Sequence, residues 1–406
     1  MSHKPLSGRR VIELGTMVAA PFATHILSQL GAEVIKVEPP TGDTTRALVR
    51  GGPGGTFIAY NHGKKSLSID LTTKEGSLVF HKLAATADVV IHNLSPAATR
   101  KLGITAGDLK KDYPELIYCH IRGYAKGPQH DDLATNPVAE ASTGVMADNI
   151  VGGRPSRLGP SYHDQFAGAY AVIRVLATML NTEPSAKDRD IEIGLYETGL
   201  HIAGRDLAGV QLKTQLLGRP EKEAGGEFAM PGYGAYKTSD GRWIYLLVLT
   251  DAHWKKLSQG LGMPEADDLG LAHLRERKKQ RDRVEAAVRN SIGDLSYGDA
   301  VNKLTKAGVG YTEVLPLERV LEAPQARYSG KLRNLDFGGL HFEVPEFPGY
   351  GEVDDGLAPP HLGQHTVEIM EQLGFDQETC GRFLDKGALI QAKEEASVWA
   401  PKRKDK

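Results

Sequence analysis

The sequence predicts an α/β protein with a large Rossmann-like domain and a smaller α+β domain. Three observations lead to this prediction. Short apolar runs, typical of buried parallel strands, alternate with helical patterns over the first half of the chain. A charged, glycine-rich stretch then interrupts the alternation, and a strong hairpin signal follows it. The length of 406 residues also exceeds the usual size of a single hydrophobic core.

The opening segment predicts a βαβ unit of the nucleotide-binding kind. A strand over 10–14 leads through the small-residue turn MVAAP at 17–21 into a helix over 21–30 and a second strand over 33–37. Pro21 suits the first turn of this helix, because the N–H that proline lacks has no partner there. The turn does not carry the glycine fingerprint of a dinucleotide site. We therefore expect a nucleotide-bearing ligand other than NAD at this turn.

The remaining elements follow from the same patterns. We predict further strands of the large domain at 66–71, 88–92, 116–121 and 190–195, and helices at 74–86, 105–111, 164–180 and about 197–217. In the small domain we predict strands at 233–238 and 242–248 joined by a Ser-Asp-Gly turn, then helices at 251–261, 279–291 and 297–307.

The domain boundaries are predicted from shifts in composition. We place the large domain at 1–217, completed by 351–406, and the small domain at 233–320. The stretches 218–232 and 321–350 are then the outgoing and returning linkers.

Composition argues against several classes of function. A net charge of −2 without a long Lys/Arg stripe gives no electrostatic basis for binding nucleic acid. No apolar run is long enough to span a membrane, and the N-terminus has no signal core, so we expect a cytoplasmic protein unless a transit peptide has been removed. Cys119 and Cys380 make neither a disulfide framework nor a metal cluster, which fits a reducing compartment.

Motifs spread over nearly the whole chain indicate a family. In order they are the opening segment, NHGKKSLSIDL at 61–71, ADVVIHNLSPAATRKLG at 87–103, HIRGYAKGP at 120–128, DIEIGLYE at 190–197, PGYGAYKTSD at 231–240 and PHLGQHTVEIMEQLG at 360–374. Together they resemble the class III CoA-transferases of the CaiB/BaiF type, which include formyl-CoA transferases and α-methylacyl-CoA racemases. The resemblance implies a CoA-transferase and an interlocked homodimer.

Asp164 has two compatible interpretations. A carboxylate just before an apolar helix is most simply an N-cap. The resemblance instead makes Asp164 the catalytic nucleophile, preceded by a Gly-Pro loop and followed by the small residues at 167–169. Amides of a helix N-terminus stabilise an anion and can also stabilise a developing oxyanion, so one position can serve both roles.

The implied reaction needs no permanently bound cofactor and no metal, because each step exchanges one activated carboxyl derivative for another. Asp164 would attack the acyl-CoA thioester, and the CoA would pass through an aspartyl thioester to an acceptor acid. Water must be excluded, since an anhydride hydrolyses. Gly225 and Gly226, before the small domain, are candidates for a lid or for a plain linker.

The resemblance also suggests binding residues. The expected CoA contacts are Val18, Ala20, Pro21, Leu71, Asn93 and Leu94, with Lys65, Lys74 and Arg100 as basic candidates for the phosphates and Arg46 and Arg122 as weaker ones. Donors for a second carboxylate of the substrate are expected from Tyr162 and His163, with His62 and Gln165 as further candidates.

The sequence leaves alternatives open for both the substrate and the reaction. Val18 and the loop GGEF at 225–228 depart from the glutamine and the four-glycine run of formyl-CoA:oxalate transferases, so we expect C4–C5 dicarboxylates such as succinate, mesaconate, itaconate or citramalate. One alternative is an α-methylacyl-CoA racemase, for which His130 is a poor match to the distinctive histidine. Others are intramolecular CoA transfer within one dicarboxylate and a CoA-binding relic. The donor and the acceptor are not determined by the sequence.

Overall fold

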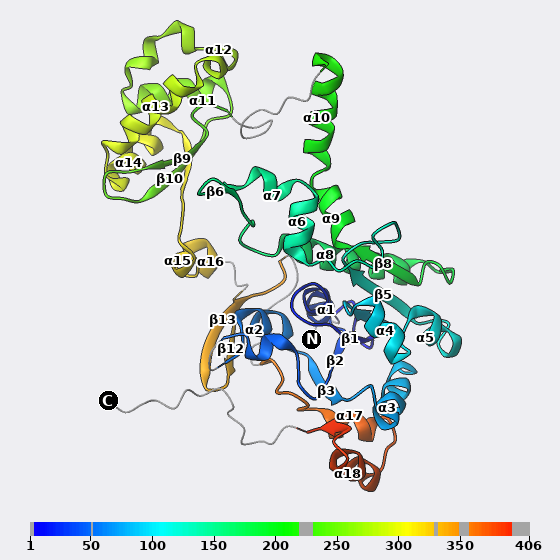
Figure 1. Cartoon of the computed structure of the whole chain (residues 1–406). Helices are drawn as coiled ribbons and strands as arrows, with labels where there is room; N and C mark the ends of the chain where they lie inside the picture. Colours follow the sequence, from blue (N-terminus) through cyan, green and yellow to red (C-terminus); the bar gives the residue numbers. More distant parts are fainter. Residues whose placement is uncertain (1–3, 50–51, 219–229, 329–331, 349–356, 392–406) are drawn as a thin grey trace. The chain divides into compact units, whose positions relative to one another are not determined.

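The computed structural model describes residues 4–49, 52–218, 230–328, 332–348 and 357–391 (Figure 1). The chain divides into two compact units, which we call the large unit (Met1–Gly204 with Ser329–Lys406) and the small unit (Arg205–Tyr328). No helix in the described part of the chain is long and apolar enough to cross a bilayer.

A seven-stranded sheet lies at the centre of the large unit. Its strands are β1 (Arg10–Leu14), β2 (Glu33–Glu38), β3 (Lys65–Ile69), β4 (Val89–His92), β5 (Ile117–Arg122), β8 (Asp190–Gly194) and β14 (Leu389–Ile390). They lie in the order β14-β3-β2-β1-β4-β5-β8, and all neighbours are parallel except β14 and β3. Counted along the chain, the parallel strands have the order 3-2-1-4-5-6, which confirms the predicted Rossmann-like fold.

Helices cover both faces of this sheet. One face carries α1 (Ala19–Gln29), α6 (Asn136–Ser142), α8 (Tyr162–Leu180) and α9 (Leu195–Ile202), and the other carries α3 (Lys74–Ala84), α4 (Pro96–Leu102), α5 (Ala106–Asp112), α17 (Thr366–Gln372) and α18 (Gln377–Asp385). Successive residues of a strand point to opposite faces of the sheet. Val11 belongs to the core that includes α1 and α8, whereas Ile12 and Leu14 belong to the core that includes α3 and α18. Burial on both faces explains why these strands read as continuous apolar runs.

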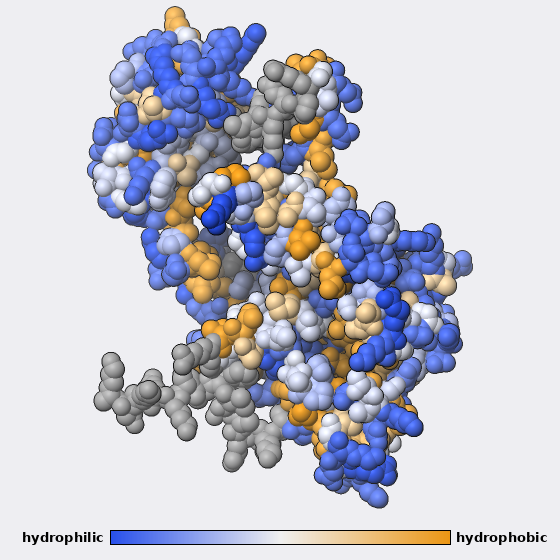
Figure 2. All heavy atoms as spheres, in the orientation of Figure 1, coloured by the Kyte–Doolittle hydropathy of each residue, from blue (hydrophilic) through white to orange (hydrophobic). Residues whose placement is uncertain are grey.

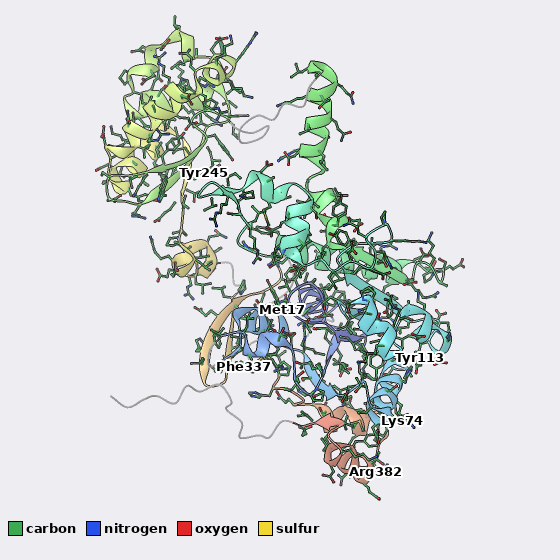
Figure 3. All side chains as sticks on the ribbon, viewed as in Figure 1. Met17, Lys74, Tyr113, Tyr245, Phe337 and Arg382 are labelled. Carbon is green, nitrogen blue, oxygen red and sulfur yellow. The ribbon has the colours of Figure 1, made fainter. Side chains whose placement is uncertain are left out.

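A hairpin near the C-terminal part of the chain returns to the large unit. It consists of β12 (Leu332–Phe337) and β13 (Leu340–Pro345), and it packs on α2 (Gly55–Asn61), as Figures 1 and 3 show. The rings of Phe57 and Phe337 lie 6.2 Å apart in this contact. The short elements η1 (Thr44–Ala47), α7 (Val145–Asp148), β6 (Ile150–Val151) and β7 (Arg154–Pro155) complete the unit.

The small unit combines an antiparallel sheet with helices, as the sequence predicted for an α+β domain. Its strands β9 (Gly234–Lys237), β10 (Trp243–Leu247) and β11 (Gly310–Glu313) lie in the order β11-β10-β9. Its helices are α10 (Gly204–Leu217), α11 (Asp251–Leu261), α12 (Leu274–Lys279), α13 (Arg281–Gly293), α14 (Tyr297–Ala307), α15 (Leu317–Val320) and α16 (Pro324–Tyr328), with the 3-10 turns η2 (Pro264–Asp267) and η3 (Leu269–Leu271). Ile244 and Leu246 face the helices and form the core with Val288.

Three details differ from the predictions. The helix expected over about 197–217 is two helices, α9 and α10, with Ala203 between them. No residue of α10 is buried, and the structure divides the chain into its two units at Gly204 rather than at 217. The chain also returns at Ser329 rather than at 351, because the β12–β13 hairpin packs on α2 and lies inside the predicted linker.

Helices α1 and α8 cross at a distance that only glycine permits. A Cβ atom built at Gly168 in α8 would lie 2.7 Å from the carbonyl oxygen of Ala19 and 3.3 Å from the amide nitrogen of Ala23. Backbone atoms cannot move aside as a flexible side chain can. The interhelical contact therefore depends on the missing side chain of Gly168.

We expect Gly168→Ala to lower the free energy of unfolding by about 1–2 kcal/mol, because overpacking outweighs the better helix propensity of alanine. Gly381 in α18 is the matched control, since a Cβ there meets no atom within 4 Å. Gly381→Ala should raise stability by about 0.5–1 kcal/mol. Denaturant unfolding followed by circular dichroism measures both, and a stabilising Gly168→Ala would contradict the close crossing.

Candidate active site

The candidate site lies where the strand order of the sheet reverses. Strands β1 and β4 are neighbours at this switch point, and Thr16 and Asn93 follow their carboxyl ends. The N–H of Thr16 donates to Asn93 Oδ1 at 2.9 Å, and Asn93 Nδ2 donates to the carbonyl oxygen of Thr16 at 2.8 Å. Ligands of doubly wound sheets bind in the crevice at this position. Asn93 therefore fixes the backbone at the place where a ligand is expected.

The turn after β1 has a strained backbone. Met17, labelled in Figure 3, has a φ of 63°, and it is the only non-glycine residue with a positive φ in the described ranges. Such a conformation costs on the order of 1 kcal/mol or more and persists only where the surroundings impose it. The N–H of Met17 contacts Asp43 Oδ1 at 3.5 Å, and the Thr44 hydroxyl donates to Met17 Sδ at 3.3 Å.

Three fully buried charged side chains support this turn. Glu13 Oε1 lies 2.7 Å from Lys36 Nζ, and Glu13 Oε2 lies 2.7 Å from Lys64 Nζ. Each lysine also donates to a carbonyl oxygen of the turn, Lys36 to Gly15 at 2.8 Å and Lys64 to Pro21 at 3.0 Å. A Cβ at Gly15 would clash with Ala20 at 2.6 Å, so the turn is tight.

The pKa values within this cluster reflect burial opposed by pairing. Burial alone would raise the pKa of the Glu13 carboxyl, but the two ammonium groups lower it below its usual range. Burial and the charge of Lys36 lower the pKa of Lys64 to about 8, although Glu13 opposes this. For Lys36, the carboxylates of Glu13, Asp43 and Glu38 overcome burial and raise the pKa. Pairing therefore favours the ionised forms of Glu13 and Lys36, whereas Lys64 is the member of the cluster whose pKa lies nearest neutral pH.

The network continues through the loop after β2. Lys36 Nζ lies 2.9 Å from Asp43 Oδ2, and Asp43 Oδ1 accepts from the N–H of Thr45 at 2.9 Å. Glu38 binds Arg46 through two contacts of 2.7 Å, and Arg46 also donates to the carbonyl oxygen of Pro360 at 2.8 Å. The structure therefore gives Arg46 a buried pairing role instead of the weak phosphate role considered from sequence.

An apolar cavity of about 230 Å³ opens beside the turn at the carboxyl ends of the strands. Two of the predicted CoA contacts, Leu71 and Leu94, line it. Its other lining residues are Leu14, Gly15, Thr16, Val37, Glu38, Pro39, Asp43, Ile69, Asp70, Thr72 and Leu102. The cavity and the strained turn thus share the backbone of Gly15 and Thr16.

The basic residues predicted for phosphates lie in different places. Lys74 (Figure 3) and Arg100 are exposed and lie two positions from the cavity residues Thr72 and Leu102, and Arg100 contacts Asp131 at 3.5 Å. Lys65 begins β3, whereas the cavity lies beyond the other end of that strand. At about 3.3 Å per residue the separation is roughly 13 Å.

Lys65 is also already paired at its own end of the sheet. Its Nζ contacts Glu33 at 3.0 Å and Glu368 at 2.7 Å. The structure therefore does not bring Lys65 together with the other predicted CoA contacts. Its neighbour Lys64 is the lysine that reaches the turn.

Asp164 is the third residue of α8 and not its N-cap. The capping position is Ser161, whose side chain makes no capping hydrogen bond. The side chain of Asn136 performs this role from α6: its Oδ1 accepts from the N–H of His163 at 3.0 Å and from that of Asp164 at 3.4 Å. The simple N-cap interpretation of Asp164 is therefore wrong, because another helix supplies the cap.

The Asp164 carboxyl group is half-buried and accepts no hydrogen bond from any described residue. Burial raises its pKa to about 7; Arg157 opposes this shift and the negative charge of Glu140 adds to it. An isolated carboxylate with a raised pKa is a strong base for its type, and perturbed groups of this kind are candidates for chemistry.

The four residues predicted as donors for a substrate carboxylate differ in burial and in their partners. Tyr162 is exposed, whereas His163 is buried with Nε2 3.2 Å from Thr143 Oγ1, and burial lowers its pKa. Gln165 donates to the hydroxyl of Tyr60 at 2.8 Å. His62 is buried, 3.9 Å from Glu346, and burial lowers its pKa to about 3.

The α1–α8 crossing connects Asp164 to the strained turn. Gly168 lies one helical turn after Asp164 and packs against Ala19, the first residue of α1. The predicted turn contacts divide by exposure: Val18 is half-buried, whereas Ala20 and Pro21 are buried and pack against Gly15. The fold therefore places the predicted nucleophile and the predicted CoA turn on adjacent helices.

Two other predicted features are the racemase candidate His130 and the glycine pair at 225–226. His130 is bonded through Nε2 to Arg122, and Glu192 contacts both side chains at the carboxyl ends of β5 and β8. Gly225 and Gly226 lie outside the described residues. Among the described residues, no group of three His, Cys, Asp or Glu side chains could hold a metal ion.

Sequence reasoning missed the residues that support this site. Glu13 and Lys36 stand inside otherwise apolar strands, and a charge within a buried strand is a signal that it has a buried partner. Asn136 and Glu140 carry no comparable signal, since a four-residue spacing on a short polar helix is common. Only the tertiary contact of α6 with α8 shows their relation to Asp164.

Comparison with known proteins supports the resemblance found in the motifs. A model of CoA-transferase family III matches residues 6–366. The chain is 31% identical to a succinate–glutarate CoA-transferase of Agrobacterium fabrum, over 92% of this chain and 97% of that protein. It is 28% identical to an (R)-2-hydroxy-4-methylpentanoate CoA-transferase of Clostridioides difficile, over 94% and 98%. A crystal structure of a CaiB/BaiF family protein from Brucella suis matches with a TM-score of 0.78 and 28% identity, over 92% and 100%.

We expect Lys64→Met to reduce the free energy of unfolding of the large unit by about 3 kcal/mol or more, because it leaves Glu13 with one buried partner instead of two. Lys65→Met is the control at the next position, since Lys65 is partly exposed and its ion pairs should contribute less than about 1 kcal/mol. Hydrogen exchange of β1–β3 measures both, with the small unit as an internal reference. Equal losses in the two variants would contradict the role given to the buried network.

Proposed function

The chain belongs to CoA-transferase family III, and we propose that it moves CoA between an acyl-CoA thioester and a carboxylic acid through a covalent intermediate on Asp164. The observation that carries this proposal is the isolated, half-buried Asp164 carboxyl group with a pKa raised to about 7. Gly168 lies one helical turn after Asp164 in α8, and it packs against Ala19 of the candidate CoA turn.

The reaction balances without oxidation or net proton transfer. An oxygen of the Asp164 carboxylate attacks the thioester carbonyl carbon, the C–S bond breaks, and CoA leaves as the thiolate. The thiolate then attacks the Asp164 carbonyl of the mixed anhydride and releases the donor acid as its carboxylate. An acceptor carboxylate attacks the carbonyl of the resulting aspartyl-CoA thioester, the C–S bond breaks, and CoA thiolate leaves behind a second mixed anhydride. The thiolate then attacks the acceptor's carbonyl carbon in this anhydride, which forms the new acyl-CoA and releases Asp164 as its carboxylate.

The candidate CoA site follows the switch point of the sheet. The apolar cavity beside Leu71 and Leu94 suits the adenine ring, and the N-terminus of α1, where Val18 makes no side-chain cap, suits the phosphates. Lys74 and Arg100 lie close enough in sequence to the cavity to supply positive charge at its rim. Val18 is the proposed direct contact of the turn, whereas Ala20, Pro21 and Asn93 shape the turn from within.

The proposed substrates are short dicarboxylates and their CoA thioesters. The relative from Agrobacterium fabrum is named for succinate and glutarate, and a human relative, 28% identical over 96% of this chain, is a succinyl-CoA:glutarate CoA-transferase. Succinate, mesaconate, itaconate and citramalate belong to the same chemical class. Intramolecular transfer between the two carboxyl groups of one such acid uses the same Asp164 chemistry.

We also propose a cytoplasmic homodimer. Support for the dimer comes from apolar side chains that are exposed on two helices, α8 of the large unit and α10 of the small unit. Phe166, Ile173 and Leu180 are exposed on α8, and Figure 2 shows apolar side chains along α10, where Leu207, Leu212, Leu216 and Leu217 are exposed. Exposed apolar patches of this kind mark association surfaces.

Asp164→Asn should reduce CoA transfer by roughly 10³-fold or more, because the amide is neither an anionic nucleophile nor able to form the anhydride. Incubation with succinyl-CoA and hydroxylamine, followed by peptide mass spectrometry, should place a hydroxamate on Asp164 in the native protein. Asp112→Asn, at the exposed end of α5, should retain activity and label.

Two results would count against this function. Undiminished transfer by a folded Asp164→Asn protein would remove Asp164 as the nucleophile. Exchange of solvent deuterium into the α-position of a 2-methylacyl-CoA at catalytic rates, without an acceptor acid, would instead establish the racemase alternative.

A further inference from the structure

A short chain of buried contacts leads from α6 to the start of α8. Glu140, which has no exposed surface, accepts from Asn136 Nδ2 at 2.5 Å through Oε1 and from the N–H of Leu158 at 3.0 Å through Oε2. Both carboxylate oxygens are therefore occupied. Asn136, which is 2% exposed, uses its other amide atom, Oδ1, for the N–H groups of His163 and Asp164.

Glu140 and the backbone of α8 together set the direction of these hydrogen bonds. An ionised carboxylate only accepts hydrogen bonds, so the amide of Asn136 must turn its NH₂ group toward Glu140. Its oxygen is then directed at the backbone of α8. The N–H groups of His163 and Asp164 favour the same orientation, because they can only donate.

This arrangement withholds helix amides from Asp164. Unpaired N–H groups in the first turn of a helix can donate to a nearby carboxylate, and such bonds lower its pKa. Here Asn136 Oδ1 occupies the N–H groups of His163 and Asp164 itself. The negative charge of Glu140 also acts on Asp164 in the direction opposite to that of Arg157.

We propose that Glu140 is a positioning residue for Asp164: through Asn136 it occupies the first amides of α8, and its buried charge keeps the Asp164 carboxylate basic and strongly nucleophilic. This inference rests on the proposed role of Asp164. It assigns a role to two buried side chains that do not themselves contact the reacting atoms.

The other ionisable groups near Asp164 are accounted for by the elements that pack around α8. Those with a charge effect on Asp164 are Glu140 of α6 and Arg157 of the preceding loop. Two histidines are disfavoured as cations, because burial lowers the pKa of His163 on α8 and of His25 on α1. The remaining three groups already have hydrogen-bond partners: Tyr60 on α2 with Gln165, Glu197 on α9 with the N–H of Ala125, and His201 on α9 with Tyr170.

The test is the pH dependence of aspartyl-intermediate formation in single-turnover experiments with succinyl-CoA. The native protein should show a rate that rises with pH through about 7, the pKa of Asp164. Glu140→Gln removes a negative charge that disfavours the ionised form of Asp164, so that form becomes easier to reach. The rising limb should move to lower pH by about one unit, and the plateau rate should fall several-fold.

A charge swap separates this role from a merely structural one. In the double variant Asn136→Asp with Glu140→Gln, a carboxylate at 136 accepts from both α8 amides and from the new amide at 140. The hydrogen-bond chain and one negative charge are restored, so the limb should return to its native position or above it. This variant also keeps the test available if Glu140→Gln alone does not fold.

Arg157→Gln gives an expected shift of opposite sign. Arg157 is exposed, so its loss should not affect folding, and removing its positive charge should move the limb to higher pH. The inference would be overturned if Glu140→Gln lost rate equally at every pH while the rising limb of its pH profile stayed at the native position. It would also be overturned if the rising limb of the double variant stayed at the lower pH of Glu140→Gln. Activity of Asp164→Asn would instead overturn the proposed function, so the two failures are distinguishable.

Discussion

The ion network around Glu13 is the constraint on which the rest of the candidate site depends. Removing three charges from water is costly, and such clusters persist only when every charge is paired and every donor is satisfied. Glu13 meets this condition by binding Lys36 and Lys64 on opposite oxygens. Both lysines pass the constraint to the backbone through the carbonyl groups of Gly15 and Pro21, and so fix the turn between β1 and α1.

The position of Asp164 follows from this turn. A fixed turn sets the start of α1, and α1 sets the depth of α8, because the backbone of Ala19 and Ala23 reaches the missing side chain of Gly168. The strain at Met17 is a further sign that the surroundings determine this backbone. A displacement of α1 would therefore move the candidate CoA turn and the candidate nucleophile together.

Glu13 and Asp164 illustrate how environment divides roles between carboxyl groups. Glu13 has two ammonium partners that lower its pKa below the usual range and commit it to structure. Asp164 has no hydrogen-bond donor in the described chain, and burial raises its pKa. Groups whose environments shift their pKa values apart are suited to different tasks. The unpaired carboxyl is the one that suits nucleophilic chemistry in a CoA-transferase.

The sequence by itself determined the strand–helix alternation, the Rossmann-like sheet, the α+β character of the small unit and the family, because apolar periodicity and motif order are local properties of the chain. It offered Lys65 for the CoA phosphates but not Lys64 for the support of the turn, and it offered an N-cap interpretation of Asp164 beside the nucleophile role, whereas Asn136 supplies the cap. It also set the domain boundary at 217, whereas the structure divides the chain at Gly204. These points required the tertiary structure, since the direction of a side chain and its partner depend on segments distant in sequence.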